Sequence, residues 1–232
     1  ATPDQAQRAG APVGWWQSIR AHHDEAEDPV KITIVGGSKG TGAQLAALAQ
    51  AAGHEVTVVS RSGSAPSGVR TVIGNATDPA VAARAVAGAD AVVVTVGGAK
   101  GVSRQRAAVT GSVIGAMQKA GVRRLLVQSS LGAGDSGSQM PAPLRLVMQA
   151  VLAKALADHN EQEAAVQGSG LDWTIVRPTG LTDKEPTGTW KALTTSDGGR
   201  LGGSIPRRDL AACMLGILSD DSSIGKAIGV SS

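Results

Sequence analysis

A glycine-rich run between an apolar segment and a helical segment constrains this chain more than any other feature. The run, Gly36-Gly37-Ser38-Lys39-Gly40-Thr41-Gly42, directly follows the β-branched stretch 30–35 and opens the Ala- and Leu-rich stretch 41–52. Small residues at such a turn let the backbone approach a phosphate, and the unpaired N–H groups of the helix N-terminus favour negative charge there. The run therefore predicts a dinucleotide-binding turn, formed by Gly36, Gly37, Ser38, Lys39, Gly40, Thr41 and Gly42.

Apolar strands and helical segments alternate through the rest of the chain. Further strands are expected at 55–60, 69–73, 91–96, 125–129 and 172–177, and further helices at 79–86, 105–120, 144–166 and 209–218. This alternation predicts an α/β fold with a doubly wound parallel sheet, the Rossmann fold, over residues 30–232. We expect residues 178–232 to form a small C-terminal cap and residues 1–29 to be an N-terminal extension.

Composition and charge exclude several other classes of protein. The formal charge is only +3, and no dense Lys/Arg stripe suggests a nucleic-acid partner. No apolar run approaches the roughly 18 residues that span a bilayer, so no membrane association is expected. Cys213 is the single cysteine, which makes a reduced, cytoplasmic setting the default. His22-His23 lies in a charged tail and is read as solvated, so no metal is expected, and the chain is expected to be a monomer or a homodimer.

The residues after the second strand distinguish between the two nicotinamide dinucleotides. An NAD site usually places a carboxylate about 20 residues after the glycine-rich turn, where it binds the ribose 2′-hydroxyl. Here the sequence reads Ser60-Arg61-Ser62. A cation flanked by hydroxyl groups suits a 2′-phosphate, so we expect Arg61 and Ser62 to favour NADP(H). The alternative is that Arg61 is an exposed loop arginine without a ligand.

Small and polar residues follow the other strands of the predicted sheet. Because the carboxyl ends of parallel strands border the crevice in which doubly wound folds bind ligands, these residues are expected to line the cofactor site. Asn75 is a candidate for hydrogen bonding to the adenine, and Asp78 for capping the next helix. The remaining expected cofactor contacts are Ala76, Val96, Gly97, Gly98, Ser129, Pro178 and Thr179.

Together these motifs resemble the NmrA-like atypical short-chain dehydrogenases/reductases, and within that group the biliverdin-IX-β/flavin reductase-like proteins. The resemblance covers roughly residues 30–230 and is carried by Gly36–Gly42, Ser60-Arg61, Gly74-Asn75, Leu131–Asp135 after Ser129-Ser130, and Ser169–Pro178 followed by Thr179–Leu181. The resemblance implies NADP(H) binding and reduction of flavin-like or quinone-like substrates.

Three departures from the family pattern affect the expected chemistry. The family has glycine where Lys39 stands, so Lys39 either reaches a phosphate or strains the turn. An acidic residue common in the family on the adenine side is Asn75 here. The chain contains no Tyr, so the usual Tyr-Lys catalytic pair cannot exist.

The resemblance instead aligns Ser130 with a serine near the nicotinamide and His159 with a helix histidine of the flavin-reductase branch. Ser130 would position the acceptor, or merely satisfy loop backbone groups. For His159, an ordinary surface position on the helix is the preferred interpretation. Trp190 is the candidate residue for covering a flat substrate.

The sequence thus supports an NADPH-dependent reductase of a flat conjugated small-molecule acceptor of flavin, quinone or tetrapyrrole type. The alternative is a non-catalytic NADP(H)-binding sensor or partner protein of the NmrA type, favoured by the missing Tyr and by Lys39. A weaker third interpretation is a domain that has lost the nucleotide, against which the retained Arg61 argues.

Overall fold

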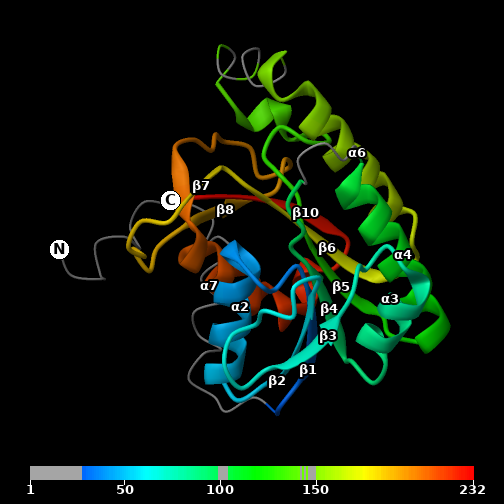
Figure 1. The fold of residues 1–232 in the computed structure, drawn as a ribbon. Helices are drawn as coiled ribbons and strands as arrows, with labels where there is room; N and C mark the ends of the chain where they lie inside the picture. The colour runs from blue at the N-terminus through cyan, green and yellow to red at the C-terminus, as the bar shows by residue number, and fades with distance from the viewer. Residues whose placement is uncertain (1–27, 99–103, 142, 144, 146–149) are drawn as a thin grey trace.

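The computed structural model describes residues 28–98, 104–141, 143, 145 and 150–232. Its central feature is a mostly parallel eight-stranded sheet in the order β3-β2-β1-β4-β5-β6-β10-β8, in which only β8 runs antiparallel to its neighbour (Figure 1). The strands of this sheet are β1 (Lys31–Val35), β2 (Glu55–Ser60), β3 (Arg70–Ile73), β4 (Ala91–Val94), β5 (Arg124–Gln128), β6 (Asp172–Pro178), β8 (Lys191–Leu193) and β10 (Lys226–Ser231). The predicted doubly wound Rossmann fold is confirmed.

Helices cover both faces of this sheet (Figure 1). On one face, α2 (Gly40–Ala51) packs against α7 (Arg207–Leu218) over a core that includes Ile34, Val58 and Val93. On the other, α3 (Pro79–Val86), α4 (Gln105–Ala120) and α6 (Ala153–Gln167) cover a core built mainly from Val, Leu and Ala. Burial on both faces explains why strands such as β4, Ala-Val-Val-Val, are uniformly apolar.

The predicted C-terminal cap divides into two parts that the sequence did not separate. Strand β10 pairs in parallel with β6, and α7 packs on α2, so both belong to the Rossmann domain itself. Between β6 and α7, β8 also joins the main sheet by pairing with β10, whereas β7 (Gly180–Thr182) pairs with β9 (Ser204–Pro206) in a separate two-stranded sheet. The sequence did not indicate this division, because β10 is a short strand far from its neighbour β6 in sequence.

Two further expectations concern segments that the structure describes only in part. The helix expected over 144–166 is described as α6 from Ala153 onward, with a bend at Leu152, while residues 142, 144 and 146–149 lie outside the described residues. Most of the N-terminal extension, 1–27, also lies outside them, including His22-His23. Short 3₁₀ helices at Ser136–Gln139 and Asp221–Ser223 complete the described elements.

Candidate active site

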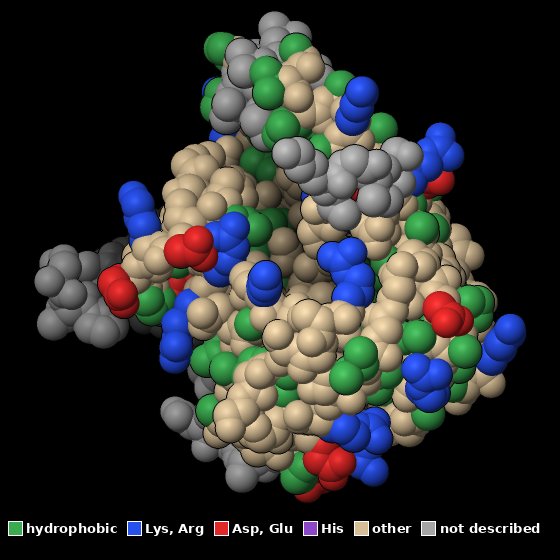
Figure 2. Space-filling model, viewed as in Figure 1, with side chains coloured by type: hydrophobic (Ala, Val, Ile, Leu, Met, Phe, Trp, Pro, Cys, Tyr) green, Lys and Arg blue, Asp and Glu red, His purple; other side chains and the backbone are tan. Residues whose placement is uncertain are grey.

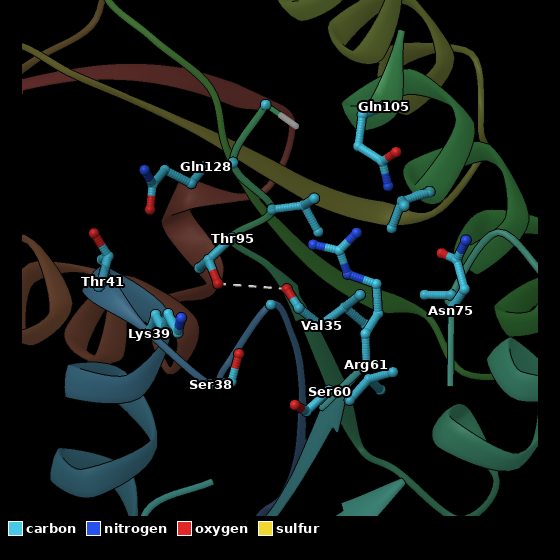
Figure 3. Close-up of a pocket in the computed structure, with 18 of the residues that line it drawn as sticks. Val35, Ser38, Lys39, Thr41, Ser60, Arg61, Asn75, Thr95, Gln105 and Gln128 are labelled. Carbon is cyan, nitrogen blue, oxygen red and sulfur yellow. Dashed lines mark hydrogen bonds between the residues drawn. The ribbon is translucent and has the colours of Figure 1, made fainter. Parts of the chain in front are cut away.

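A cavity of about 360 Å³ opens at the carboxyl ends of the strands, where β1 and β4 lie side by side and the chain winds in opposite directions from the two. Doubly wound folds bind nucleotides at this switch point. We call it the nucleotide cavity (Figure 3). It is lined by Val35, Gly36, Ser38, Lys39, Gly40, Thr41, Val59, Ser60, Arg61, Gly74, Asn75, Ala76, Thr95, Val96, Gly97, Gly98, Gln105, Val109, Gln128, Leu181 and Arg207.

The glycine-rich turn accommodates Lys39 without strain. The positive φ angles fall on Gly36 (+94°) and Gly40 (+56°), which are glycines, whereas Lys39 is extended at φ −150° and ψ 165°. Extended backbone is open to any residue, so the position of Lys39 does not require glycine. Of the two roles considered for Lys39, a strained turn is therefore wrong, and its side chain lines the nucleotide cavity.

Close packing requires glycine at two positions of the turn. A Cβ atom at Gly37 would lie 2.8 Å from the Val58 side chain, and one at Gly42 would lie 2.4 Å from the Gly36 carbonyl oxygen and from Thr95 Oγ1. Neither residue lines the nucleotide cavity. Their lack of a side chain lets α2 approach the ends of β1, β2 and β4, and contact of Gly37 and Gly42 with the cofactor remains a prediction.

The N-terminus of α2 presents positive potential to this cavity. No side chain caps this helix, and its first turn carries no acidic residue. The unpaired N–H groups and the helix dipole there favour an anion. Among the lining residues, Lys39, Arg61 and Arg207 are cationic and none is Asp or Glu, and Lys and Arg side chains border the hollow in Figure 2. These features fit the pyrophosphate of a dinucleotide.

Arg61 follows β2 and extends into the cavity beside Asn75 (Figure 3). Asn75 Oδ1 accepts a hydrogen bond from the Thr77 N–H at 3.2 Å, which leaves the amide group of its side chain available to a ligand. Asp78 caps α3 through the Ala80 N–H, as predicted. Ser62 does not line the cavity, because its hydroxyl is engaged with Ser60 and Ser64 in the exposed turn. The expected cofactor contact by Ser62, which lies beside Arg61 in the exposed turn, remains a prediction.

A second cavity of about 520 Å³ adjoins the first and shares five lining residues with it: Val96, Gly97, Gln128, Leu181 and Arg207. We call it the acceptor cavity. Its own lining is formed by Arg106, Ser129, Ser130, Leu131, Met140, Leu152, His159, Pro178, Thr179, Gly180, Gly202 and Gly203. Ser129, Pro178 and Thr179, which were expected to touch the cofactor, line this second cavity, because β5 and β6 end beyond the switch point. Their contact with the cofactor remains a prediction.

One wall of the acceptor cavity contains a buried polar cluster. Ser129 Oγ donates to Glu163 Oε1 at 2.6 Å and lies 3.4 Å from His159 Nδ1. Glu163 in turn accepts two hydrogen bonds from the guanidinium of Arg177, which is 1% exposed. The hydroxyl proton of Ser129 is therefore committed to Glu163. In a bond with Ser129, His159 Nδ1 would be the donor, which leaves Nε2 as an acceptor.

His159 is a buried member of this wall, so the preferred interpretation of a surface histidine was wrong. It is 7% exposed, since α6 turns this position toward the ends of β5 and β6. Burial, together with the positive charge of Arg106, lowers the pKa of His159 to about 4. The imidazole is consequently neutral near pH 7, where it can position a ligand by hydrogen bonding but is not a proton donor of useful acidity.

The structure places Ser130 at the acceptor cavity, but it does not place Trp190 there. Ser130 is half-buried and lines the acceptor cavity, and its hydroxyl donates to the Leu131 carbonyl at 3.2 Å, so the hydroxyl both faces the cavity and satisfies a loop backbone group. Trp190 lines neither cavity. It packs against the apolar core beneath α2 and α7, just before β8. The structure therefore corrects the expectation that Trp190 covers the substrate.

Comparison with known proteins identifies the family. A family model described as NAD(P)H-binding matches residues 36–221, which include the turn, Arg61 and both cavities. The chain belongs to this NAD(P)H-binding family. A curated relative, UPF0659 protein C216.03 from Schizosaccharomyces pombe, is 36% identical over 89 residues, which is 33% of this chain and 34% of the relative. The chain thus matches about a third of the length of that relative.

Solved structures share the fold of this NAD(P)H-binding protein over most of its length. ChuY, an anaerobilin reductase from Escherichia coli O157:H7, is 28% identical with a TM-score of 0.74, covering 86% of this chain and 96% of ChuY. A short-chain dehydrogenase/reductase from Veillonella parvula, solved in complex with NADP, has a TM-score of 0.75 at 20% identity and covers 88% and 94% of the two chains. These likenesses support an oxidoreductase-like fold.

Several residues of this candidate site were missed from the sequence. Arg207 was not among the expected site residues, yet it lines both cavities because it begins α7 at the end of β9. Gln128 lies at the end of β5, and its buried Oε1 has no hydrogen-bond partner among the described residues. Gln128 could have been predicted as a lining residue from its position at a strand end, and so could Thr95. Arg106 and Gln105 open α4 and carried no such signal.

The described residues contain no group of three or more His, Cys, Asp or Glu side chains that could hold a metal ion. Within the same part of the chain, none of the helices combines the length and the apolar character that crossing a membrane requires. Cys213 is fully buried, and burial raises the pKa of its thiol to about 12, which makes it an inert core residue.

Proposed function

We propose that this protein is an NADPH-dependent reductase of a flat conjugated acceptor of flavin, quinone or tetrapyrrole type. The observation that carries the proposal is the shared wall between the two cavities, at Val96, Gly97 and Gln128. A dinucleotide whose pyrophosphate lies at the α2 N-terminus would extend along the strand ends toward this wall. The acceptor cavity beyond it is large enough for a small conjugated molecule and has apolar sides, including Leu131, Met140 and Leu181.

The described residues suit this chemistry without a strong acid. When bound, NADPH would supply the hydride. The α2 N-terminus, Lys39 and Arg207 would hold the pyrophosphate, while Ser130 and Gln128 would orient the acceptor against the shared wall. Reduction of a conjugated acceptor depends chiefly on alignment of the two reactants, so a neutral His159 and the absence of Tyr are compatible with it.

The choice of NADPH over NADH rests on Arg61. No carboxylate lines the nucleotide cavity, so a 2′-phosphate meets a guanidinium there and no repelling charge. The NADP complex of the Veillonella parvula structure and the reductase activity named for ChuY agree with the proposal.

A non-catalytic NADP(H) sensor is the second candidate, and the observation favouring it is the lack of a titratable donor in the acceptor cavity. His159 has its pKa lowered to about 4, and the chain has no Tyr. A sensor would bind NADPH and NADP⁺ with different affinities, but it would not consume NADPH.

Turnover separates the two candidates. NADPH oxidation would be followed at 340 nm, the nicotinamide absorbance band, with FMN, riboflavin and a small quinone panel, while calorimetry measures NADPH binding. The proposal expects binding and acceptor-dependent oxidation. Binding without oxidation by any acceptor would replace the reductase by the sensor, and absence of binding would remove both.

A further inference from the structure

The acceptor cavity has a one-sided charge. Its lining contains two arginines, Arg106 and Arg207, and no Asp or Glu. Arg207 also lines the nucleotide cavity, and its guanidinium comes close to Gly40, where an added Cβ would lie 3.4 Å from its Nε. Arg207 is thus placed to serve the cofactor. Arg106 lines only the acceptor cavity, so its charge acts on whatever molecule binds there.

The partner of Arg106 does not neutralise this charge toward the cavity. Asp158 on α6 accepts one hydrogen bond from Arg106 Nη1, at 3.2 Å, and two more from the backbone N–H groups of Arg106 and Ala107 at the start of α4. Its carboxylate is therefore shared with a helix N-terminus and is not part of the cavity lining. The Arg106 side chain is only 16% exposed, which makes its remaining N–H donors costly to leave without a partner.

The charge of Arg106 also acts on His159, another residue that lines the acceptor cavity. After burial, which is the largest cause, the positive charge of Arg106 contributes to the lowered pKa of the His159 imidazole. The guanidinium lies against Gly98 at the end of β4, where an added Cβ would come within 3.1 Å of Nη1. Arg106 and His159 thus line the same cavity, and the guanidinium lies where this cavity meets the nucleotide cavity, which Gly98 lines.

Resting on the proposed function, we infer that the acceptor carries an anionic group, a phosphate or a carboxylate, and that Arg106 binds it. The conjugated ring would lie between the shared wall and the apolar residues Leu131, Met140 and Pro178, while the oxyanion accepts hydrogen bonds from the guanidinium. Arg106 is then the residue that determines specificity for charged over neutral acceptors of the same ring system.

A pair of flavins tests this inference, because FMN and riboflavin differ only by a phosphate. Each would be titrated by fluorescence into protein saturated with NADP⁺, which occupies the nucleotide cavity and permits no turnover. We expect FMN to bind about tenfold or more tightly than riboflavin, as suits a charge-assisted hydrogen bond. The same comparison between a 10-carboxymethyl flavin and lumiflavin shows whether a carboxylate serves as well as a phosphate.

Arg106→Gln should abolish the preference by weakening FMN binding, with riboflavin affinity unchanged within about twofold. Arg104→Gln is the matched control: Arg104 is two residues away, its side chain is 74% exposed and paired with Glu161, and it lines neither cavity. If Arg106→Gln does not fold, Arg106→Lys and the dependence of FMN affinity on salt test the same charge. Equal affinities for the two flavins, a preference that survives Arg106→Gln, or no binding of either flavin would overturn the inference.

The NADPH oxidation assay keeps this outcome distinct from that of the proposed function. An FMN preference lost in Arg106→Gln, without oxidation of NADPH, would support the anion site and refute the reductase. Oxidation of NADPH by neutral and anionic acceptors alike would support the reductase and refute the anion site.

Discussion

Glu163 on α6 and Arg177 on β6 form a buried two-point ion pair, with Nε–Oε1 and Nη2–Oε2 distances of 3.0 and 2.7 Å. Ser129 donates to the same carboxylate, and Arg177 also binds Asp135, which accepts a hydrogen bond from Thr195 at 2.7 Å. The pair thus connects a residue of the acceptor cavity to the segment that follows β8. It also explains Gly134, where a Cβ would lie 2.3 Å from Arg177 Nη2.

Glu163→Gln is expected to lower the free energy of unfolding by about 3–5 kcal/mol, because it leaves the Arg177 charge buried without a full partner. Chemical denaturation would measure the loss. Glu161→Gln, two residues away and paired with Arg104 at the surface, is the control and should cost less than about 1 kcal/mol. Similar losses for the two variants would show that the buried pair does not contribute in the way its geometry implies.

Arg61→Ala is expected to weaken NADPH binding about tenfold or more while changing NADH binding little, because a charge-assisted phosphate contact contributes about 1.5–3 kcal/mol. Calorimetric titration of both nucleotides measures the difference. Arg84→Ala, an exposed arginine of α3 that does not line the cavity, should change neither affinity. Equal weakening of NADPH and NADH by Arg61→Ala would remove the assignment of Arg61 to the 2′-phosphate.

Lys39→Gly and Gly40→Ala are expected to act on different properties. Lys39 is extended, so replacing it by glycine should lower NADPH and NADH affinity together through the lost charge, with no gain in stability. Gly40 has a φ of +56°, so Gly40→Ala should destabilise the fold by about 1 kcal/mol. Thermal unfolding and calorimetry separate the two effects. A clear stabilisation by Lys39→Gly would mean that the lysine strains the turn after all.

The buried, neutral His159 predicts that stability falls with acidification. Its pKa drops from 6.5 to about 4 on folding, so between these values the unfolded chain binds the proton more readily than the folded one. This contribution is fully present above pH 6.5 and is lost as the pH falls toward 4, with an upper limit of about 3 kcal/mol. Denaturation of wild type and His159→Gln across this range measures it. The variant should show a shallower pH dependence, and parallel curves would contradict the burial of a neutral imidazole.

The architecture was accessible from the sequence because each of its signals is local. The glycine-rich turn and the uniformly apolar β4 each indicate their place in the fold within a few residues, and the position of Arg61 after β2 predicts that it lines the cavity. The parts that were missed depend on contacts between distant segments. Strand β10 completes the sheet beside β6, and Arg207 reaches the cavities only because α7 packs against α2.

The same distinction between local signals and contacts of distant segments explains why the positions of His159 and Trp190 were not predicted. A histidine on a mixed polar helix carries no local mark of burial, and its position became clear only when α6 was placed beside the ends of β5 and β6. Trp190 was selected for its ring, but the packing of β8 against β10 directs it to the core beneath α2 and α7.

A crystal structure with bound NADP⁺ tests the central claim, that the two cavities form one hydride-transfer site, most directly. The account predicts the pyrophosphate at the N-terminus of α2, the 2′-phosphate in contact with Arg61, and the nicotinamide at the wall shared by Val96, Gly97 and Gln128, facing the acceptor cavity. A nicotinamide directed away from that wall, or a 2′-phosphate far from Arg61, would contradict it.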